Sequence, residues 1–295
     1  MIVTRLYGGL GNQMFQYAFA FALSSINKCD LYLDVREFDE VYSKNTVRKF
    51  DLDKFQIKGK VASEKILHKF RLTCNASRYK WFRKIAPWLP QGFLMYFKEK
   101  GYAFNASIQK NCKWGYLDGY WQSYKYFDAY RDQIVKQFIP INIDKKNREV
   151  AEEIKRENSI SLHVRRGDYV TNPHANQTHG ICSLGYYKLC IEKLEKNIDN
   201  LHFYLFSDDP TWVKENLIIH HPITIMDRNG SKDAHIDLYL MSLCKHHIIA
   251  NSSFSWWGAW LSNSKNKIVF SPHRWFQSGE STDDLIPESW EKVKG

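Results

Sequence analysis

The chain has 295 residues and a mass of 34.9 kDa, which is long for one compact domain and suits two of about 140 residues each. Hydrophobic residues make up 44% and charged residues 25%, so the composition excludes a disordered or fibrous chain. The formal net charge of +10 implies an acidic partner, which is a nucleic acid, an anionic lipid surface or a phosphorylated substrate.

The six cysteines and eleven histidines predict no metal site. No CxxC pair occurs, and adjacent histidines on a strand would point to opposite faces. The cysteines are therefore expected to be reduced structural thiols. Residues 1–10 lack the layout of a signal peptide, and the apolar run 14–23 is too short to span a bilayer. We expect a cytoplasmic protein.

The chain begins with the pattern of a βαβ unit. Residues 2–6 predict a strand, 7–11 a glycine turn, 12–26 a helix and 31–35 a second strand. The glycines suggest a dinucleotide site, but Met14 stands where the third glycine of that fingerprint belongs. A Walker loop is excluded because the Gly-Lys-Ser/Thr ending is missing.

The middle of the chain is less regular. Residues 65–84 hold seven Lys and Arg and no acid, interleaved with aromatics. A solvated helical face is one interpretation, and a patch for an anionic membrane or a lipid-diphosphate acceptor is the other. Residues 116–121 predict a strand and turn lined by aromatics, 124–138 a helix, and 147–158 a charged helix that leads into the second half.

From residue 159 onward strands and helices alternate regularly. The expected strands are 159–164, 202–206, 223–226, 246–250 and 267–270, and the expected helices are 186–196, 211–216, 234–244 and 254–261. We therefore predict an α/β protein of two Rossmann-like, doubly wound domains facing across a cleft, residues 1–150 and 151–295.

Three of the strand ends in the second half carry polar groups. Arg165 and Arg166 follow the first strand, Ser207, Asp208 and Asp209 the second, and a serine-rich turn the fourth. In a parallel sheet these ends lie on one rim, where ligands collect. Paired guanidiniums grip phosphate bidentately, and a serine turn that opens a helix offers hydroxyl and N–H groups to an anion. Each piece alone also fits a plain structural role, such as an Arg–Asp pair or a helix cap. Together they favour a diphosphate, with Asp208 and Asp209 near the base or ribose.

Other chemistries find little support. The only D-x-D spacing, Asp51 and Asp53, follows no clear strand end, and neither a G-x-S-x-G elbow nor a Cys/His pairing occurs.

Four motifs stand out along the chain. They are Gly8-Gly-Leu-Gly-Asn-Gln-Met-Phe-Gln-Tyr17, His163-Val-Arg-Arg-Gly-Asp-Tyr169, Phe206-Ser-Asp-Asp209 and Asn251-Ser-Ser-Phe-Ser-Trp-Trp-Gly-Ala-Trp260. Together they resemble the motifs of the bacterial α-1,2-fucosyltransferases of glycosyltransferase family 11. Their order and spacing span nearly the whole chain. The resemblance implies a GT-B architecture, GDP-β-L-fucose as donor, inversion to an α-1,2 linkage on a galactosyl glycan, and no metal or other cofactor. It places the enzyme in bacterial surface polysaccharide synthesis.

The resemblance also assigns roles. Arg165 would bind the diphosphate and His163 the guanosine, and Asp209 would help hold the nucleotide. Arg166 and Asp168 would keep the turn in shape. The remaining expected substrate contacts are Asp208 and the residues Gly9, Gly11, Asn12, Gln13, Asn251, Ser252, Ser253 and Ser255. Of all these, Arg165, Asn12 and His163 are assigned to catalysis.

The expected mechanism is stabilisation of the GDP leaving group by fixed cations and N–H dipoles. The resemblance places Asn12 well for a catalytic base, but its amide takes no proton at neutral pH. The sequence therefore names no catalytic base. Residues 38–120 match no motif, so the acceptor, any membrane contact and the oligomeric state stay open. The rival functions are an α-1,6- or protein O-fucosyltransferase, and a basic nucleic-acid-binding protein for which net charge is the only support.

Overall fold

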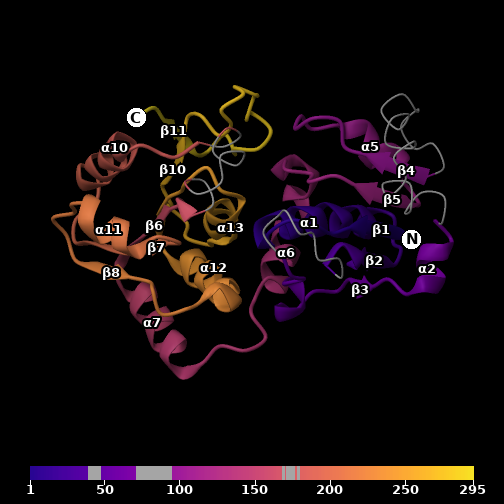
Figure 1. Cartoon of the computed structure of the whole chain (residues 1–295), viewed down its shortest axis with the longest axis horizontal. Helices are drawn as coiled ribbons and strands as arrows, with labels where there is room; N and C mark the ends of the chain where they lie inside the picture. The colour runs from indigo at the N-terminus through magenta and orange to yellow at the C-terminus, as the bar shows by residue number, and fades with distance from the viewer. Residues whose placement is uncertain (39–47, 71–94, 168–169, 171–176, 178–179) are drawn as a thin grey trace. The chain divides into compact units, whose positions relative to one another are not determined.

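The computed structural model describes residues 1–38, 48–70, 95–167, 170, 177 and 180–295 (Figure 1). The chain forms two compact units, the first made of residues 1–139 and 281–285 and the second of residues 140–280 and 286–295. Each unit contains one parallel β-sheet with helices packed on it. The expected boundary after residue 150 falls inside helix α7 (Lys145–Arg156), which packs in the core of the second unit.

The first unit is built on a parallel sheet with the strand order β3-β2-β1-β5-β4. Its strands are β1 (Ile2–Arg5), β2 (Leu31–Asp34), β3 (Lys60–Val61), β4 (Tyr96–Lys98) and β5 (Gly115–Asp118). Its described α-helices are α1 (Leu10–Ile26), α2 (Glu64–His68), α5 (Ala106–Asn111) and α6 (Arg131–Gln137), and its described 3-10 turns are η1 (Arg36–Phe38), η2 (Leu52–Lys54), η6 (Tyr124–Tyr126) and η7 (Asp128–Tyr130). The βαβ opening is confirmed, whereas β3 and β4 were not predicted.

The continuous helix expected over residues 124–138 is wrong in its first half. Two 3-10 turns occupy this stretch, and α6 begins only at Arg131. The reason is that the adjacent residues Tyr126 and Phe127 are both buried against α1, where their rings lie 4.4 Å from Phe19 and 5.9 Å from Phe15. A regular surface helix would direct two consecutive side chains about 100° apart and bury one of them.

The second unit has a parallel sheet with the order β11-β10-β9-β6-β7-β8. Its strands are β6 (Asn158–Val164), β7 (Leu201–Ser207), β8 (Ile223–Ile225), β9 (His246–Ile248), β10 (Val269–Pro272) and β11 (Glu291–Val293). Besides α7 its described helices are α10 (Leu184–Glu195), α11 (Pro210–Asn216), α12 (Ala234–Leu243) and α13 (Ser253–Leu261), with the 3-10 turn η8 (Ser231–Asp233). All nine elements predicted in this half are confirmed, and β11 is the strand that the pattern missed.

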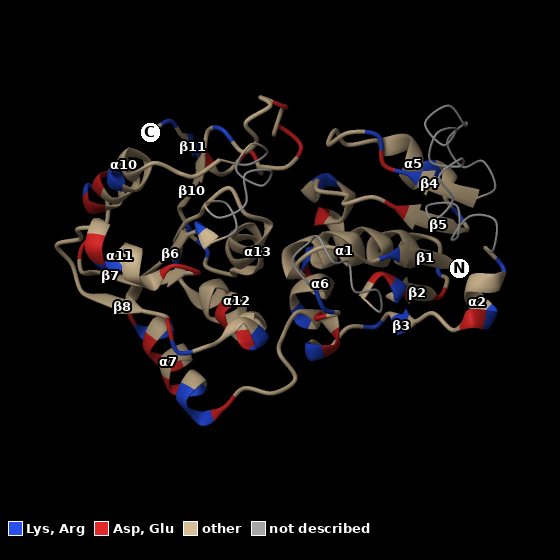
Figure 2. Ribbon diagram, viewed as in Figure 1, with Lys and Arg blue, Asp and Glu red and all other residues tan. Residues whose placement is uncertain are grey.

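Helices cover both faces of this sheet, as a doubly wound fold requires. On one face lie α10 and α11 (Figure 1). Their buried side chains form one core cluster with those of β6, β7 and β9. On the other, Val150, Ala151 and Ile154 of α7 pack with α12 and with Tyr204 and Phe206 of β7. These positions recur at helical spacing, and acidic and basic residues mix over the rest of α7 (Figure 2).

The tryptophans of the second unit serve the core. Trp256, Trp257 and Trp260 of α13 are buried and in mutual ring contact, and Trp290 lies 5.5 Å from Trp256. The cysteines that the structure describes are all free thiols, as expected, while Cys74 lies outside the described residues. Among the described helices, none is both long and apolar enough to cross a bilayer.

Candidate functional site

Strands β6 and β7 bring the predicted arginines and aspartates together. They pair in parallel with Val164 opposite Ser207, so the residues that follow each strand meet at the same rim. Arg165 Nη1 lies 2.9 Å from Asp208 Oδ2, and the backbone N–H of Arg166 donates to Asp208 Oδ1 at 2.8 Å. Asp208 therefore fixes both the guanidinium of Arg165 and the turn that carries it.

Arg166 contacts Asp209 and Trp212 within the second unit. Its Nε lies 3.3 Å from Asp209 Oδ2, and its guanidinium stacks 4.0 Å from the ring centroid of Trp212. Asp209 in turn caps α11 by accepting the N–H of Trp212 at 3.1 Å, and Pro210 starts the helix. Asp208 and Asp209 were predicted to contact the nucleotide. In the structure Asp208 pairs with Arg165, and Asp209 pairs with Arg166 and caps α11.

The next residue, Gly167, leaves no room for a side chain. A Cβ built there would lie 3.0 Å from Cγ of Asp208 and closer still to Oδ2. Glycine at this position lets the turn lie against the carboxylate. Asp168, the last polar residue of the motif, lies outside the described residues.

His163 is buried at the end of β6. The pKa of its imidazole is lowered to about 3, mainly by burial and further by the charge of Arg165. The ring is therefore neutral at physiological pH. Its Nδ1 has no hydrogen-bond partner among the described residues, while its backbone carbonyl accepts from the Tyr187 hydroxyl at 3.1 Å. A neutral, buried nitrogen can hydrogen-bond a ligand but cannot serve as an acid.

The serine turn after β9 has divided roles. Ser252 caps α13 by accepting the N–H of Phe254 at 3.3 Å, and the buried Ser255 donates to the carbonyls of Ala250 and Ser252. Asn251 is buried and donates to the carbonyls of Gly180 and Trp275 at 3.4 and 3.3 Å. Of the serines predicted here, Ser253 is the one whose side chain is partly exposed.

In the first unit the loop after β1 is held by Gln13. This fully buried side chain donates to the carbonyls of Gly8 and Lys49 at 3.0 and 2.8 Å, and it accepts the N–H of Asp51 at 3.0 Å. Gly8 has φ +79°, a conformation that other residues rarely adopt. Gln13 thus anchors the loop, whereas the half-buried Asn12 accepts from Gln122 Nε2 at 2.8 Å.

The other two loop residues lie at the start of α1. Gly9 is its N-cap, with its carbonyl accepting the N–H groups of Asn12 and Gln13, and Gly11 is buried in the first turn.

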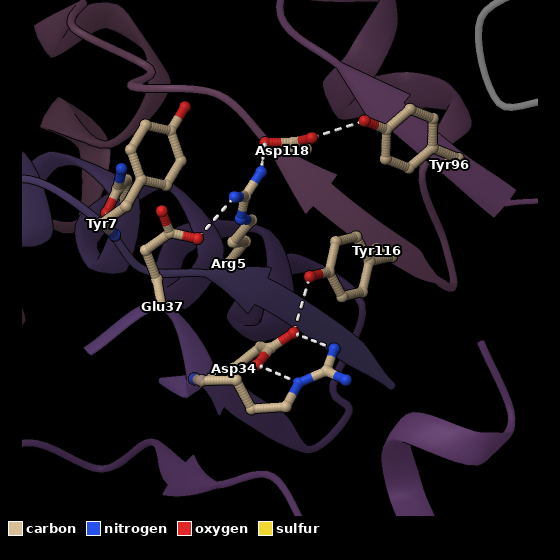
Figure 3. A network of polar contacts seen from close by, with 9 residues as sticks. Arg5, Tyr7, Asp34, Glu37, Tyr96, Tyr116 and Asp118 are labelled. Atoms are coloured by element: carbon tan, nitrogen blue, oxygen red, sulfur yellow. Dashed lines mark hydrogen bonds and ion pairs between the residues drawn. The ribbon is translucent and has the colours of Figure 1, made fainter. Parts of the chain in front are cut away.

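A polar network at the carboxyl ends of β1, β2 and β5 was not predicted (Figure 3). Arg5 lies between Glu37 at 2.6 Å and Asp118 at 3.4 Å, and it stacks 5.1 Å from the ring centroid of Tyr7. Asp118 also accepts from the Tyr96 hydroxyl. Beside it, Arg36 and the Tyr116 hydroxyl hold Asp34 at 2.6 and 2.7 Å and keep the pKa of that carboxyl low despite its burial.

The turn after β5 completes this edge. The carboxylate of Glu99, which follows β4, accepts the backbone N–H groups of Tyr120 and Trp121 at 2.6 and 2.9 Å. The rings of Tyr7 and Tyr120, which are both largely buried, lie 4.7 Å apart. The aromatic lining predicted for residues 116–121 was the one sequence signal for this feature. Among the described residues, no group of three or more His, Cys, Asp and Glu side chains is placed to hold a metal ion.

Comparison with known proteins agrees with the motifs. The family model described as glycosyl transferase family 11 matches residues 1–293. The chain belongs to this family. The family 11 chain is 37% identical over 301 residues to an α-1,2-colitosyltransferase of Escherichia coli, covering 100% of this chain and 99% of the relative. It is 35% identical over 302 residues to the O-antigen biosynthesis glycosyltransferase WbnK of Escherichia coli, covering 97% and 98%.

A solved structure supports the fold of this family 11 chain. A mutant of Arabidopsis thaliana FUT1 in complex with GDP superposes with a TM-score of 0.51 and 12% identity, covering 92% of this chain and 70% of that chain. The architecture is therefore of the GT-B type, as expected from the resemblance.

Proposed function

We propose that this glycosyltransferase moves L-fucose from GDP-β-L-fucose to the 2-hydroxyl of a galactosyl residue in a bacterial surface glycan, forming an α-1,2 linkage with inversion and without a metal. Family 11 membership and two relatives of nearly full coverage, one named for an α-1,2 transfer and one for O-antigen biosynthesis, support this proposal. The observation that carries it is the rim at β6 and β7, where Arg165 is fixed by Asp208 beside the neutral His163.

The rim suits a diphosphate leaving group. Cleaving the bond between the sugar and GDP builds negative charge on the β-phosphate, and a guanidinium already held in place stabilises that charge without reorganising. The FUT1 structure of the same fold contains GDP, which is consistent with a nucleotide here. The unpartnered Nδ1 of His163 can hydrogen-bond the guanosine, as the family resemblance implies. Inversion then follows from attack of the acceptor hydroxyl on the opposite face of the sugar.

GDP-colitose is a second candidate donor, because one relative is named an α-1,2-colitosyltransferase. Colitose is L-fucose without its 3-hydroxyl, so GDP-colitose would fit the same diphosphate rim. The two donors are separated by comparing kcat/KM for each at one acceptor concentration. A site that hydrogen-bonds the 3-hydroxyl rejects the deoxy sugar strongly, because a buried polar group then loses its partner.

Nearly all of the net positive charge of the chain is carried by the first unit. The first unit holds 23 Lys and Arg against 14 Asp and Glu, whereas the second holds 19 against 18. In the first unit the exposed Lys58, Lys60, Lys65 and Lys69 gather at β3 and α2 (Figure 2). This excess supports an acceptor with a lipid diphosphate at an anionic membrane surface. Residues 71–84 of the predicted basic patch lie outside the described residues.

Thermal unfolding with GDP, UDP, CMP and NAD tests the nucleotide. Each would be present well above its dissociation constant, and selective stabilisation by GDP is expected because ligand binding to the folded state raises the melting temperature. No response to GDP, or a larger response to NAD, would contradict the proposal.

Arg165→Ala tests the role of the guanidinium. Turnover is expected to fall by about a hundredfold or more, the size typical of deleting one oxyanion donor. Arg165→Lys is the matched variant, because it keeps the charge but loses the planar fork that Asp208 orients. Near-normal transfer by Arg165→Ala would refute the assignment.

A further inference from the structure

In the part of the chain that the structure describes, each sheet has two edge strands, and three of these four strands carry charged side chains. They are β3 with Lys60, β4 with Lys98, and β11 with Glu291 and Lys292. A charge on an open edge disfavours pairing with a further strand. The fourth edge strand, β8, has the sequence Ile-Thr-Ile and carries no charge (Figure 2). It therefore lacks this protection.

The absence of charge extends beyond β8 itself. Residues 217–226 contain no Lys, Arg, Asp or Glu, although charged residues make up 25% of the chain. Asp227, the first charged residue after this run, pairs with Lys214 at 3.3 Å. Within the run the side chain of Ile218 is 80% exposed and that of Ile223 is 47% exposed. An uncharged, apolar edge of the second unit's sheet thus faces solvent.

The backbone of β8 is open along the same edge. The N–H of Met226 donates to the Leu205 carbonyl of β7 at 2.8 Å. In a strand, alternate residues direct their N–H and C=O groups to the same neighbour. Met226 and, two positions earlier, Thr224 therefore face β7, so the backbone groups of Ile223 and Ile225 point away from it. Outward groups of this kind are a template for another strand.

We propose that β8 pairs with β8 of a second copy of this chain, antiparallel to it, about a two-fold axis that passes through Thr224 perpendicular to the sheet. Ile223 then lies opposite Ile225 of the second copy, and the outward N–H and C=O groups of the two residues bond to one another. Because Ile223 and Ile225 point to the same face of the sheet, the pairing also adds apolar cross-strand contacts. This inference is independent of the proposed glycosyl transfer.

Two features of the edge favour a second copy over a different protein. A symmetric interface brings residues near the axis close to their own counterparts, so a charge there would meet a like charge, and residues 217–226 contain none. The side chain of Ile225 also packs on the core cluster that α10 and α11 form with the sheet. Pairing across the axis would continue that apolar layer from one copy into the other.

The test measures the mass of the protein in solution by sedimentation velocity from about 1 to about 100 µM, since association depends on concentration. The wild type is expected to approach twice 34.9 kDa as the concentration rises. Ile223→Lys should remain a monomer, because it gives β8 the charge that the other edge strands have. Val61→Lys is the control: Val61 is 55% exposed on the edge strand β3, and its replacement should leave the dimer intact.

A charge-swap experiment tests the symmetry. In the proposed register the two side chains at position 223 lie diagonally across the axis, about 7–8 Å apart, which long side chains can span. Ile223→Lys and Ile223→Glu should therefore each be monomeric and should form a dimer when they are mixed in equal amounts. Their circular dichroism spectra should match that of the wild type.

Four results would overturn the proposal. The first is a wild type that stays a monomer at about 100 µM, a measurement that needs no variant to fold. The second is a dimer that survives Ile223→Lys, and the third is a dimer that Val61→Lys breaks equally well. The fourth is a pair of folded, monomeric charge variants that do not combine, because β8 would then not meet its own counterpart.

Discussion

Replacing Gly167 with alanine tests how firmly Asp208 is held. The new Cβ would lie 3.0 Å from Cγ of Asp208 and well inside 3.0 Å of its Oδ2, a separation that real Cβ atoms essentially never show. The carboxylate can turn away only by giving up Arg165 at 2.9 Å and the N–H of Arg166 at 2.8 Å. A hydrogen bond to a charged group contributes about 1.5–3 kcal/mol. The alanine returns about 0.4–1 kcal/mol by restricting the unfolded chain. Two such contacts are lost, so we expect the free energy of unfolding of this unit to fall by about 2–5 kcal/mol.

A double-mutant cycle with Asp208→Ala isolates this contact. Without the carboxylate the methyl group of alanine meets nothing rigid, so Gly167→Ala should stabilise that background by about 0.4–1 kcal/mol. The expected coupling is therefore about 3–6 kcal/mol. Hydrogen exchange of the β6 and β7 amides measures the unfolding free energy of this unit alone. Equal costs of Gly167→Ala in both backgrounds would show that Asp208 moves freely and would refute the idea that it fixes Arg165.

Two further predictions concern stability. Gln13→Ala should lower the unfolding free energy by about 2–4 kcal/mol, because it leaves a cavity and unpaired backbone groups in the loop after β1. Thermal unfolding measures this, and the exposed Gln56→Ala, expected to be near neutral, is the control. Burial raises the pKa of Asp237 in α12 from 3.8 to about 7, with Asp233 adding to the rise and the amide of Asn229 opposing it. The folded state then holds this proton more tightly than the unfolded state, so stability falls as pH rises from about 4 to about 7. Asp237→Asn should therefore raise the melting temperature at about pH 8 and leave it unchanged or lower at about pH 4, and an equal shift at both values would contradict this cause.

The sequence predicted most accurately the strands with long buried runs. The expected bounds of β6 and β7 are right within one residue, because their buried runs are long and both faces are covered by helices. Strands β3, β4 and β11 are two or three residues long and lie at sheet edges. Lys60 and Val61 of β3 are both exposed, so no apolar pattern marks them. Their conformation comes from pairing with a neighbour that is distant in sequence, and periodicity cannot show it.

The candidate site was predictable where it follows a predicted strand. Arg165, Arg166, Asp208 and Asp209 were placed on one rim because β6 and β7 were recognised, and the register then decided which arginine meets which aspartate. Glu99 was missed because β4, which delivers it, was itself not predicted. Its proximity to the turn at Tyr120 depends on β4 and β5 pairing with Lys98 opposite Asp118. Long-range register of this kind is absent from a single sequence.

The rim of the second unit presents guanidinium groups without a large excess of positive charge. It presents two guanidiniums, yet Asp208 and Asp209 pair with them at 2.9 and 3.3 Å, and the unit as a whole has only one more cation than anions. General electrostatic attraction of an anion is therefore weak there, and the contribution of the arginines must come from directed N–H groups in a fixed plane. A leaving diphosphate gains from such donors as its charge develops, whereas any passing anion gains little. In the proposed transfer the aspartates would weaken the attraction of the bound diphosphate in the ground state while keeping Arg165 oriented for the transition state.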